Sequence, residues 1–205
     1  TFFPQLIAGP IVRWKDFNKQ ITSAFDKTIN LQFLVSGVFL FTLGLCKKTL
    51  IADPIAFYFA DPVFLLASEG ERISTFSAWV GTIAFTFQIY FDFSGYTDMA
   101  LGLAYLFGIK LPINFDSPYR ATSIIDFWRR WHITLSNFLR DYLYIPLGGN
   151  KKGLSNQFFA IMVTMLIGGL WHGASWTFIF WGFLHGVFLI INHLYRFIKI
   201  RSSTT

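Results

Sequence analysis

The chain has 205 residues, of which 54% are hydrophobic, 20% are aromatic and only 14% are charged. Soluble domains carry about 25% charged residues, so the composition excludes a soluble globule and indicates a polytopic membrane protein. The formal net charge of +6 does not indicate nucleic acid as a partner, because the basic residues flank apolar segments, a pattern that suits membrane surfaces. The single cysteine, Cys46, excludes an internal disulfide, and no Cys/His cluster has the spacing of a zinc site.

The N-terminal half alternates between apolar and polar segments. Residues 2–12 are apolar but contain two prolines and a glycine, so they predict a re-entrant or interfacial segment and not a regular helix. Residues 13–30 are polar and amphipathic, and we expect them on a membrane surface. The apolar runs at 31–46 and 76–93 predict the first two spans. Between them, residues 52–75 contain prolines and charged residues and predict a loop with a short apolar helix inside.

A helix with one apolar face is predicted after a proline-bounded loop at residues 112–119. Ser123 and Asp126 have the spacing of a helix capping box and predict the start of a helix over residues 123–140. The apolar stripe of this helix consists of Ile124, Phe127, Trp128, Trp131, Leu135 and Phe138. Its arginines fall mostly off the stripe, so we expect the helix to lie along the membrane interface.

His172 stands inside a long apolar stretch, between the runs at 158–170 and 174–191. An ionisable side chain at membrane depth is costly, and it is rare unless it faces a cavity or a partner. The first run is shorter than the roughly 20 residues of a spanning helix, and glycines on both sides of His172 permit a break in the helix. Two interpretations stay open: a buried bend with a catalytic His172, or a surface loop between two spans.

His132 is the second candidate, and two tryptophans and two arginines crowd it in the sequence FWRRWHITLS. It is either an acid/base or substrate-orienting residue paired with His172, or a structural histidine at headgroup level on an aromatic-rich helix. We predict that the two histidines share a cavity, because an unpaired histidine in hydrocarbon is costly.

The other ionisable residues favour structural roles. Asp92, Asp98 and Asp116 lie beside aromatic or apolar stretches, and we expect each to have an arginine partner, because buried charges are usually paired. The candidate partners are Arg120, Arg129 and Arg140. His185 and His193 lie on the last apolar helix, where we expect satisfied interior or interfacial histidines and not ligands.

Six motifs follow one another in an order that is typical of a known family. They are FPQLIAGPI at 3–11, YFDFSGYTD at 90–98, NFDSPY at 114–119, FWRRWHITLS at 127–136, RDYLYIPLGG at 140–149 and GLWHG at 169–173. With these motifs the chain resembles the membrane-bound O-acyltransferase (MBOAT) family, and within it the alginate O-acetyltransferase (AlgI-like) branch. The resemblance implies that His172 is the family's essential histidine. It also implies that His132 is the second polar residue of the active site, which varies between branches.

The resemblance further implies an all-α polytopic membrane protein with an MBOAT-type helical core and re-entrant or interfacial helices. Residues 1–205 would be part of that transmembrane domain, in a bacterial inner membrane. The implied function is O-acetylation of an extracytoplasmic polysaccharide, such as alginate or another cell-envelope glycan. The implied donor is acetyl-CoA or an acylated carrier, with no bound cofactor and no metal. The implied partners are membrane lipid and a separate extracytoplasmic acetyltransferase protein.

Acyl transfer suits the chemistry of these residues, because a neutral histidine can accept the proton of an attacking hydroxyl. Main-chain amides, tryptophans or His132 are candidate donors to the oxyanion, and a covalent acyl-His172 intermediate is a further option. Two other classes stay open. One is a transporter or flippase in which Asp92, Asp98 and His172 form a proton or substrate path, although we find no internal repeat. The other is a non-catalytic scaffold subunit of a polysaccharide export complex.

Overall fold

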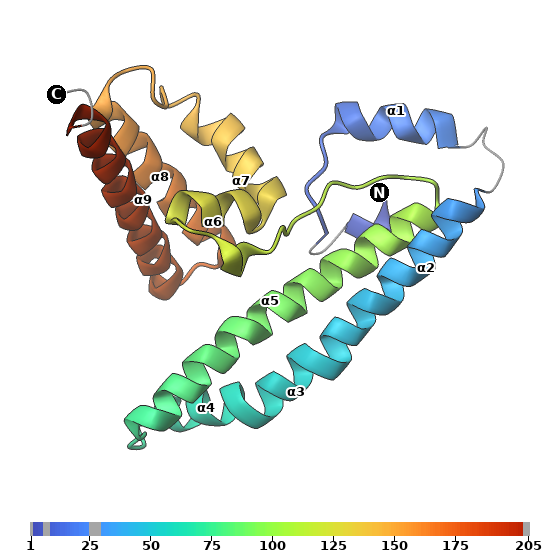
Figure 1. Ribbon diagram of the computed structural model, residues 1–205, viewed down its shortest axis with the longest axis horizontal. Helices are drawn as coiled ribbons and strands as arrows, with labels where there is room; N and C mark the ends of the chain where they lie inside the picture. The colour runs from blue at the N-terminus through green and yellow to red at the C-terminus, as the bar shows by residue number, and fades with distance from the viewer. Residues whose placement is uncertain (1, 6–8, 25–29, 203–205) are drawn as a thin grey trace. The chain divides into compact units, whose positions relative to one another are not determined.

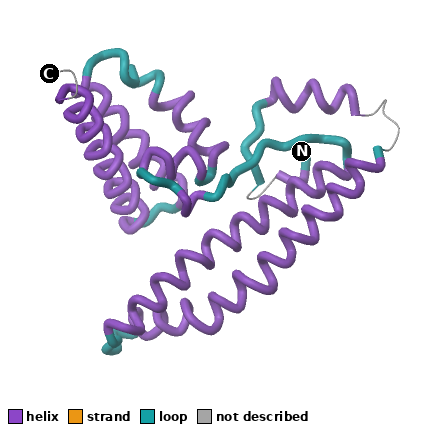
Figure 2. The backbone as a smooth tube through the Cα atoms, in the orientation of Figure 1, coloured by secondary structure: helices purple, strands orange, loops and turns teal. Residues whose placement is uncertain are grey.

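A computed structural model describes residues 2–5, 9–24 and 30–202 of the chain. All regular structure in these residues is helical (Figure 2), which confirms the predicted all-α fold of a polytopic membrane protein. Three helices are long and apolar enough to cross a membrane. They are Leu31–Ser68, Leu154–His172 and Trp176–Lys199.

The chain forms two compact units, Thr1–Ile113 and Asn114–Thr205. The N-terminal unit is built on two long helical segments that lie side by side (Figure 1). One is α5, Thr75–Leu106. The other is a succession of α2 (Leu31–Cys46), the π-helical η2 (Lys47–Ala52), α3 (Asp53–Ile55), the π-helical η3 (Ala56–Ala60) and α4 (Asp61–Ser68). The short η1 (Phe3–Gln5) and the amphipathic α1 (Trp14–Ala24) precede them.

The predicted loop at 52–75 is wrong over most of its length, because the chain stays helical to Ser68. A proline inside a regular α-helix lacks an N–H and clashes with the carbonyl one turn back. Here Pro54 and Pro62 each stand in the first turn after a π-helical segment. The wider π turn shifts the hydrogen bonds by one residue, as in the bond from Asp53 N to Lys48 O. It therefore lets the helix continue past both prolines.

The contact between α2 and α5 depends on glycines. A Cβ atom on Gly95 would lie 2.8 Å from the carbonyl oxygen of Gly44, and one on Gly37 would lie 2.8 Å from that of Gly102. The two backbones approach so closely because neither helix has a side chain there. α5 also extends well past the predicted span at 76–93, and it is not among the three helices that are apolar enough to cross a membrane.

The C-terminal unit consists of a helical hairpin and a group of short helices. The hairpin is α8 (Leu154–His172) and α9 (Trp176–Ser202), which pack along each other (Figure 1). The short helices are the 3₁₀ turn η4 (Pro118–Arg120), α6 (Ile124–Arg130), α7 (Ile133–Leu139) and the π-helical η5 (Arg140–Tyr144). α6 contacts α9, and η5 contacts α8. The single helix predicted over 123–140 is wrong, since it breaks at Trp131 and His132.

Candidate active site

Half of the capping box predicted at the start of α6 is present, because Asp126 accepts from the main-chain N–H of Thr122 and not from that of Ser123. Ser123 Oγ accepts a hydrogen bond of 3.1 Å from Asp126 N, and Asp126 Oδ2 accepts one of 3.3 Å from Thr122 N. Asp126 also forms an ion pair of 2.9 Å with Arg130, one turn later. The hydrogen bond from Arg130 lowers the pKa of Asp126. These contacts fix both ends of α6, which finishes at Arg130, two residues before His132.

His132 lies at the break between α6 and α7, in a left-handed backbone conformation with φ 42° and ψ 55°. Such a conformation is uncommon for a residue other than glycine and persists only where neighbours fix it. Asn114 fixes it here. The Asn114 carbonyl oxygen accepts a hydrogen bond of 3.0 Å from Ile133 N. Its side-chain Oδ1 accepts bonds from Thr134 N at 3.3 Å and from Thr134 Oγ1 at 2.6 Å.

His172 is the last residue of α8, directly before the three-residue turn into α9. Its side chain is exposed. The imidazole lies edge-on to Trp171 and to Trp181, with ring centroids 5.1 Å and 5.3 Å away. The bend that the glycines predicted is therefore present, and it puts His172 between an indole of α8 and an indole of α9.

Three histidines and three tryptophans of the C-terminal unit form one group, which we name the histidine–tryptophan cluster. Its members are Trp128, His132, Trp171, His172, Trp181 and His185. The Trp171 centroid lies 6.2 Å from that of His132 and 5.1 Å from that of His172. The two imidazole centroids are thus at most about 11 Å apart. A single substrate can span that separation.

The two candidate histidines differ in environment. His132 is only 5% exposed. Burial, together with repulsion from His172, lowers the pKa of His132 from its ordinary 6.5 to about 4. His132 is therefore neutral at pH 7, with one ring nitrogen that donates a hydrogen bond and one that accepts. His172, by contrast, is open to an incoming substrate.

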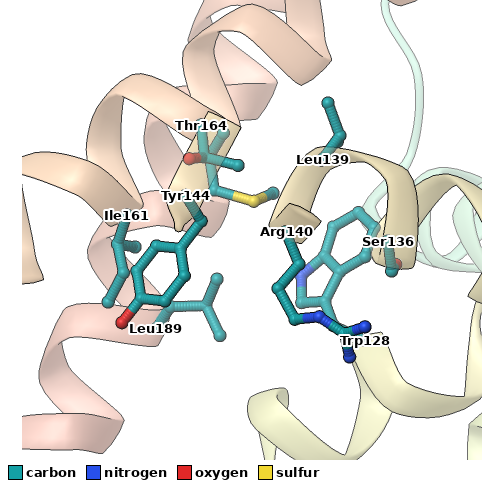
Figure 3. Close-up of a pocket in the computed structure, with 9 residues that line it drawn as sticks. Trp128, Ser136, Leu139, Arg140, Tyr144, Ile161, Thr164 and Leu189 are labelled. Atoms are coloured by element: carbon teal, nitrogen blue, oxygen red, sulfur yellow. The ribbon is translucent and has the colours of Figure 1, made fainter. Parts of the chain in front are cut away.

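A cavity of about 160 Å³ adjoins the cluster but does not contain its two candidate residues. It is lined by residues of α6, α7, η5, α8 and α9, and Trp128 is the one member of the cluster in its wall (Figure 3). The cavity predicted to be shared by His132 and His172 is therefore not this one. Their common neighbour is the Trp171 ring.

The predicted arginine partners of the aspartates are wrong. Lys47 Nζ lies 2.6 Å from Asp98 Oδ2, and Lys48 Nζ lies 2.7 Å from Asp92 Oδ1. Both lysines belong to η2, which contacts α5, so they lie on the helical segment that packs directly against these carboxylates. Asp116 pairs with an arginine outside the three candidates, Arg130, at 3.6 Å.

Three residues of this site were not predicted from the sequence to take part in it. Asn114 gives no signal of its own, because its contacts with residues 133 and 134 depend on the fold. Trp181 gives no signal in the sequence either, because its ring contacts His172 and His185 only in the folded hairpin. His185 was expected to be satisfied, yet its buried Nδ1 has no hydrogen-bond partner in the described part of the chain. No group of His, Cys, Asp and Glu suited to a metal ion occurs among those residues.

The fold and the site define a helical membrane protein with two histidines grouped at the turn of a membrane-spanning hairpin. A sequence model of the membrane-bound O-acyltransferase family matches residues 1–205. The chain belongs to the membrane-bound O-acyltransferase family. The resemblance inferred from the six motifs is thus confirmed.

Named relatives agree with this assignment. The chain is 51% identical over 195 residues to a peptidoglycan O-acetyltransferase of Helicobacter pylori, covering 95% of this chain and 36% of the relative. It is 49% identical over 192 residues to a probable alginate O-acetylase of Pseudomonas putida, covering 94% and 38%. It is 32% identical over 200 residues to a teichoic acid D-alanyltransferase of Streptococcus thermophilus, covering 93% and 48%. The chain therefore spans between about a third and a half of the length of these relatives.

Proposed function

We propose that this chain carries the acyl-transfer site of a multi-pass O-acetyltransferase in a bacterial inner membrane. The acceptor is a hydroxyl group of an extracytoplasmic polysaccharide. The observation that carries the proposal is the grouping of His132 and His172 around Trp171, where a long apolar hairpin turns. The names of the relatives support the reaction class, since those named above act in acetylation or D-alanylation of alginate, peptidoglycan or teichoic acid.

His172 is the general base in this proposal. Its imidazole accepts the proton of the acceptor hydroxyl while the hydroxyl oxygen attacks the carbonyl carbon of the acyl donor. The bond between that carbon and the donor's leaving group then breaks, and the proton passes from His172 to the leaving group. The exposure of His172 supports this role, because both substrates must reach the same ring nitrogen.

His132 orients the reacting groups. It is neutral at pH 7 because its pKa is lowered to about 4, so its ring carries one N–H group and adds no second positive charge beside a protonated His172. A fixed N–H donor stabilises the oxyanion of a tetrahedral intermediate. The left-handed backbone held by Asn114 keeps the His132 ring in one place, as a preorganised donor requires.

The acyl donor is acetyl-CoA or an acylated carrier, and a separate extracytoplasmic acetyltransferase is the protein partner. Both statements come from the family resemblance. The apolar hairpin with His172 at its turn suits a protein that passes an acyl group across or along a membrane.

The proposal is tested by acyl release from labelled acetyl-CoA by the full-length protein, purified, reconstituted in lipid discs and supplied with the acceptor polysaccharide. We expect label to leave acetyl-CoA in the presence of wild-type protein and not with His172→Ala at equal protein level. Equal release by both proteins would contradict the role of His172. No release by either, with intact acetylation of the glycan in cells, would exclude acetyl-CoA as the direct donor and indicate the acylated carrier.

A further inference from the structure

The cavity beside the histidine–tryptophan cluster has a strongly apolar interior. Ile161 and Met165 of α8, Leu189 of α9 and Leu139 of α7 contribute to its wall. In Figure 3, Ile161 and Leu189 lie across the cavity from Arg140 and Trp128. Aliphatic side chains therefore form much of the wall, and the side with Arg140 and Trp128 is the one that we call its polar side.

Two of the three hydroxyl groups in the wall, those of Thr164 and Ser136, are occupied by the protein itself. Thr164 Oγ1 donates a hydrogen bond of 2.6 Å to Ala160 O, and Ser136 Oγ donates one of 3.3 Å to Trp131 O. Both protons are thus used by main-chain carbonyls. A stably bound water needs about two to four polar partners, which the aliphatic walls do not supply. The interior suits a hydrocarbon chain better than water.

Two donors stand on the polar side of the cavity. Trp128 Nε1 is buried and has no hydrogen-bond partner in the described part of the chain, and a buried donor without an acceptor is costly. Arg140 donates through Nε to Asp141 Oδ1 at 2.8 Å, and its side chain is 55% exposed. A guanidinium has five N–H donors in a fork, so this one contact leaves donors for a second anion.

We propose that this cavity binds the part of one acyl chain nearest the headgroup of an anionic phospholipid. The chain lies against Ile161, Met165 and Leu189, its ester carbonyl accepts the Trp128 Nε1–H, and its phosphate pairs with Arg140. α8 and α9 are long and apolar enough to cross a membrane, so lipid chains are the apolar molecules available beside them. The positive charge of Arg140 selects an anionic headgroup. This site is independent of the proposed acyl transfer.

The test uses the full-length protein in phosphatidylcholine vesicles that contain a small fraction of phosphatidylglycerol with a photoreactive diazirine near the ester end of one chain. After illumination, the adducts are mapped by mass spectrometry. We expect adducts on the peptides that contain Ile161, Met165 and Leu189, and fewer with a phosphatidylcholine probe. For a partly exposed charged contact, Arg140→Gln should lower labelling by phosphatidylglycerol roughly two- to fivefold, and Arg140→Lys should retain most of it.

Two further variants separate the site from general lipid contact. Arg129→Gln removes an exposed arginine of α6 and should leave labelling unchanged. Leu189→Trp fills the cavity and should abolish these adducts, while its melting temperature shows whether it has folded. Equal labelling by both probes, no effect of Arg140→Gln, or adducts spread over α8 and α9 without enrichment at the cavity would each overturn the proposal.

Discussion

The side-chain oxygen of Asn114 accepts hydrogen bonds from both the main-chain N–H and the hydroxyl of Thr134. Asn114 is fully buried, with 0% of its surface exposed. These bonds, together with that from Ile133 N to Asn114 O, tie residue 114 to the residues directly after His132. The left-handed turn at His132 therefore depends on the contact between Asn114 and Thr134, which are twenty positions apart in the chain.

Removing the Asn114 side chain should displace His132. Asn114→Ala removes the side-chain oxygen that accepts two hydrogen bonds from Thr134, at a cost of about 1–3 kcal/mol, and frees the strained turn to relax. We expect a lower melting temperature and a loss of acyl transfer at equal protein level. Thr134→Ser, which retains the hydroxyl, should stay close to wild type, and Thr134→Val should fall between them. Wild-type activity in Asn114→Ala would show that the turn does not position His132.

Breaking the ion pair between Lys47 and Asp98 should lower the stability more than breaking the pair between Lys48 and Asp92, because the first pair is more buried. The side chains of Lys47 and Asp98 are 22% and 21% exposed, whereas those of Lys48 and Asp92 are 41% and 43% exposed. Asp98→Asn strands a partly buried ammonium, and we expect a loss on the order of 1–3 kcal/mol. Asp92→Asn should cost about 1 kcal/mol or less.

Thermal unfolding of the four proteins, the double variant Lys47→Met/Asp98→Leu included, measures these differences. The double variant should recover part of the loss, because it removes both charges and leaves neither unpaired. If Asp92→Asn is as damaging as Asp98→Asn, burial does not set the strength of these pairs.

The stability of the protein should depend on the pH through His132. Its pKa is about 4 in the fold against 6.5 ordinarily, so between these values the unfolded state binds more protons. Stability is therefore fully present above about pH 6.5 and is lost as the pH falls towards 4, by up to about 3 kcal/mol. Melting temperatures at pH 7.5 and 4.5 test this. His132→Gln, which cannot be protonated there, should lose less stability than wild type between the two pH values.

Much of the helical fold is readable from the sequence, because a run of apolar residues with few charges predicts a helix directly. The two helices on either side of His172 were predicted in this way, and the cap at Ser123 was predicted from the spacing of Ser123 and Asp126. The helix through 52–68 was not, because the prolines at 54 and 62 are read as breaks unless the π-helical turns before them are known. The break at His132 was also missed, since the apolar stripe continues through it.

The site was predicted in its residues but not in its surroundings. Periodicity along one helix cannot show that Trp181 lies between His172 and His185, because the chain turns at residues 173–175. Sequence distance likewise conceals the pairs of Lys47 with Asp98 and of Lys48 with Asp92. A His185 variant is consequently a poor control for a His172 variant, because the Trp181 ring contacts both imidazoles.

The central claim is that His172 is the catalytic base, and the most direct test compares His172→Ala with His193→Ala in the full-length protein. His193 lies on α9 about two turns beyond His185, outside the histidine–tryptophan cluster, and is the matched control. Polysaccharide acetylation and protein level are measured together in cells. We predict normal abundance for both variants, near-normal acetylation for His193→Ala, and a loss of roughly 10²–10⁴-fold in rate for His172→Ala. Normal acetylation by His172→Ala at normal abundance would contradict the claim.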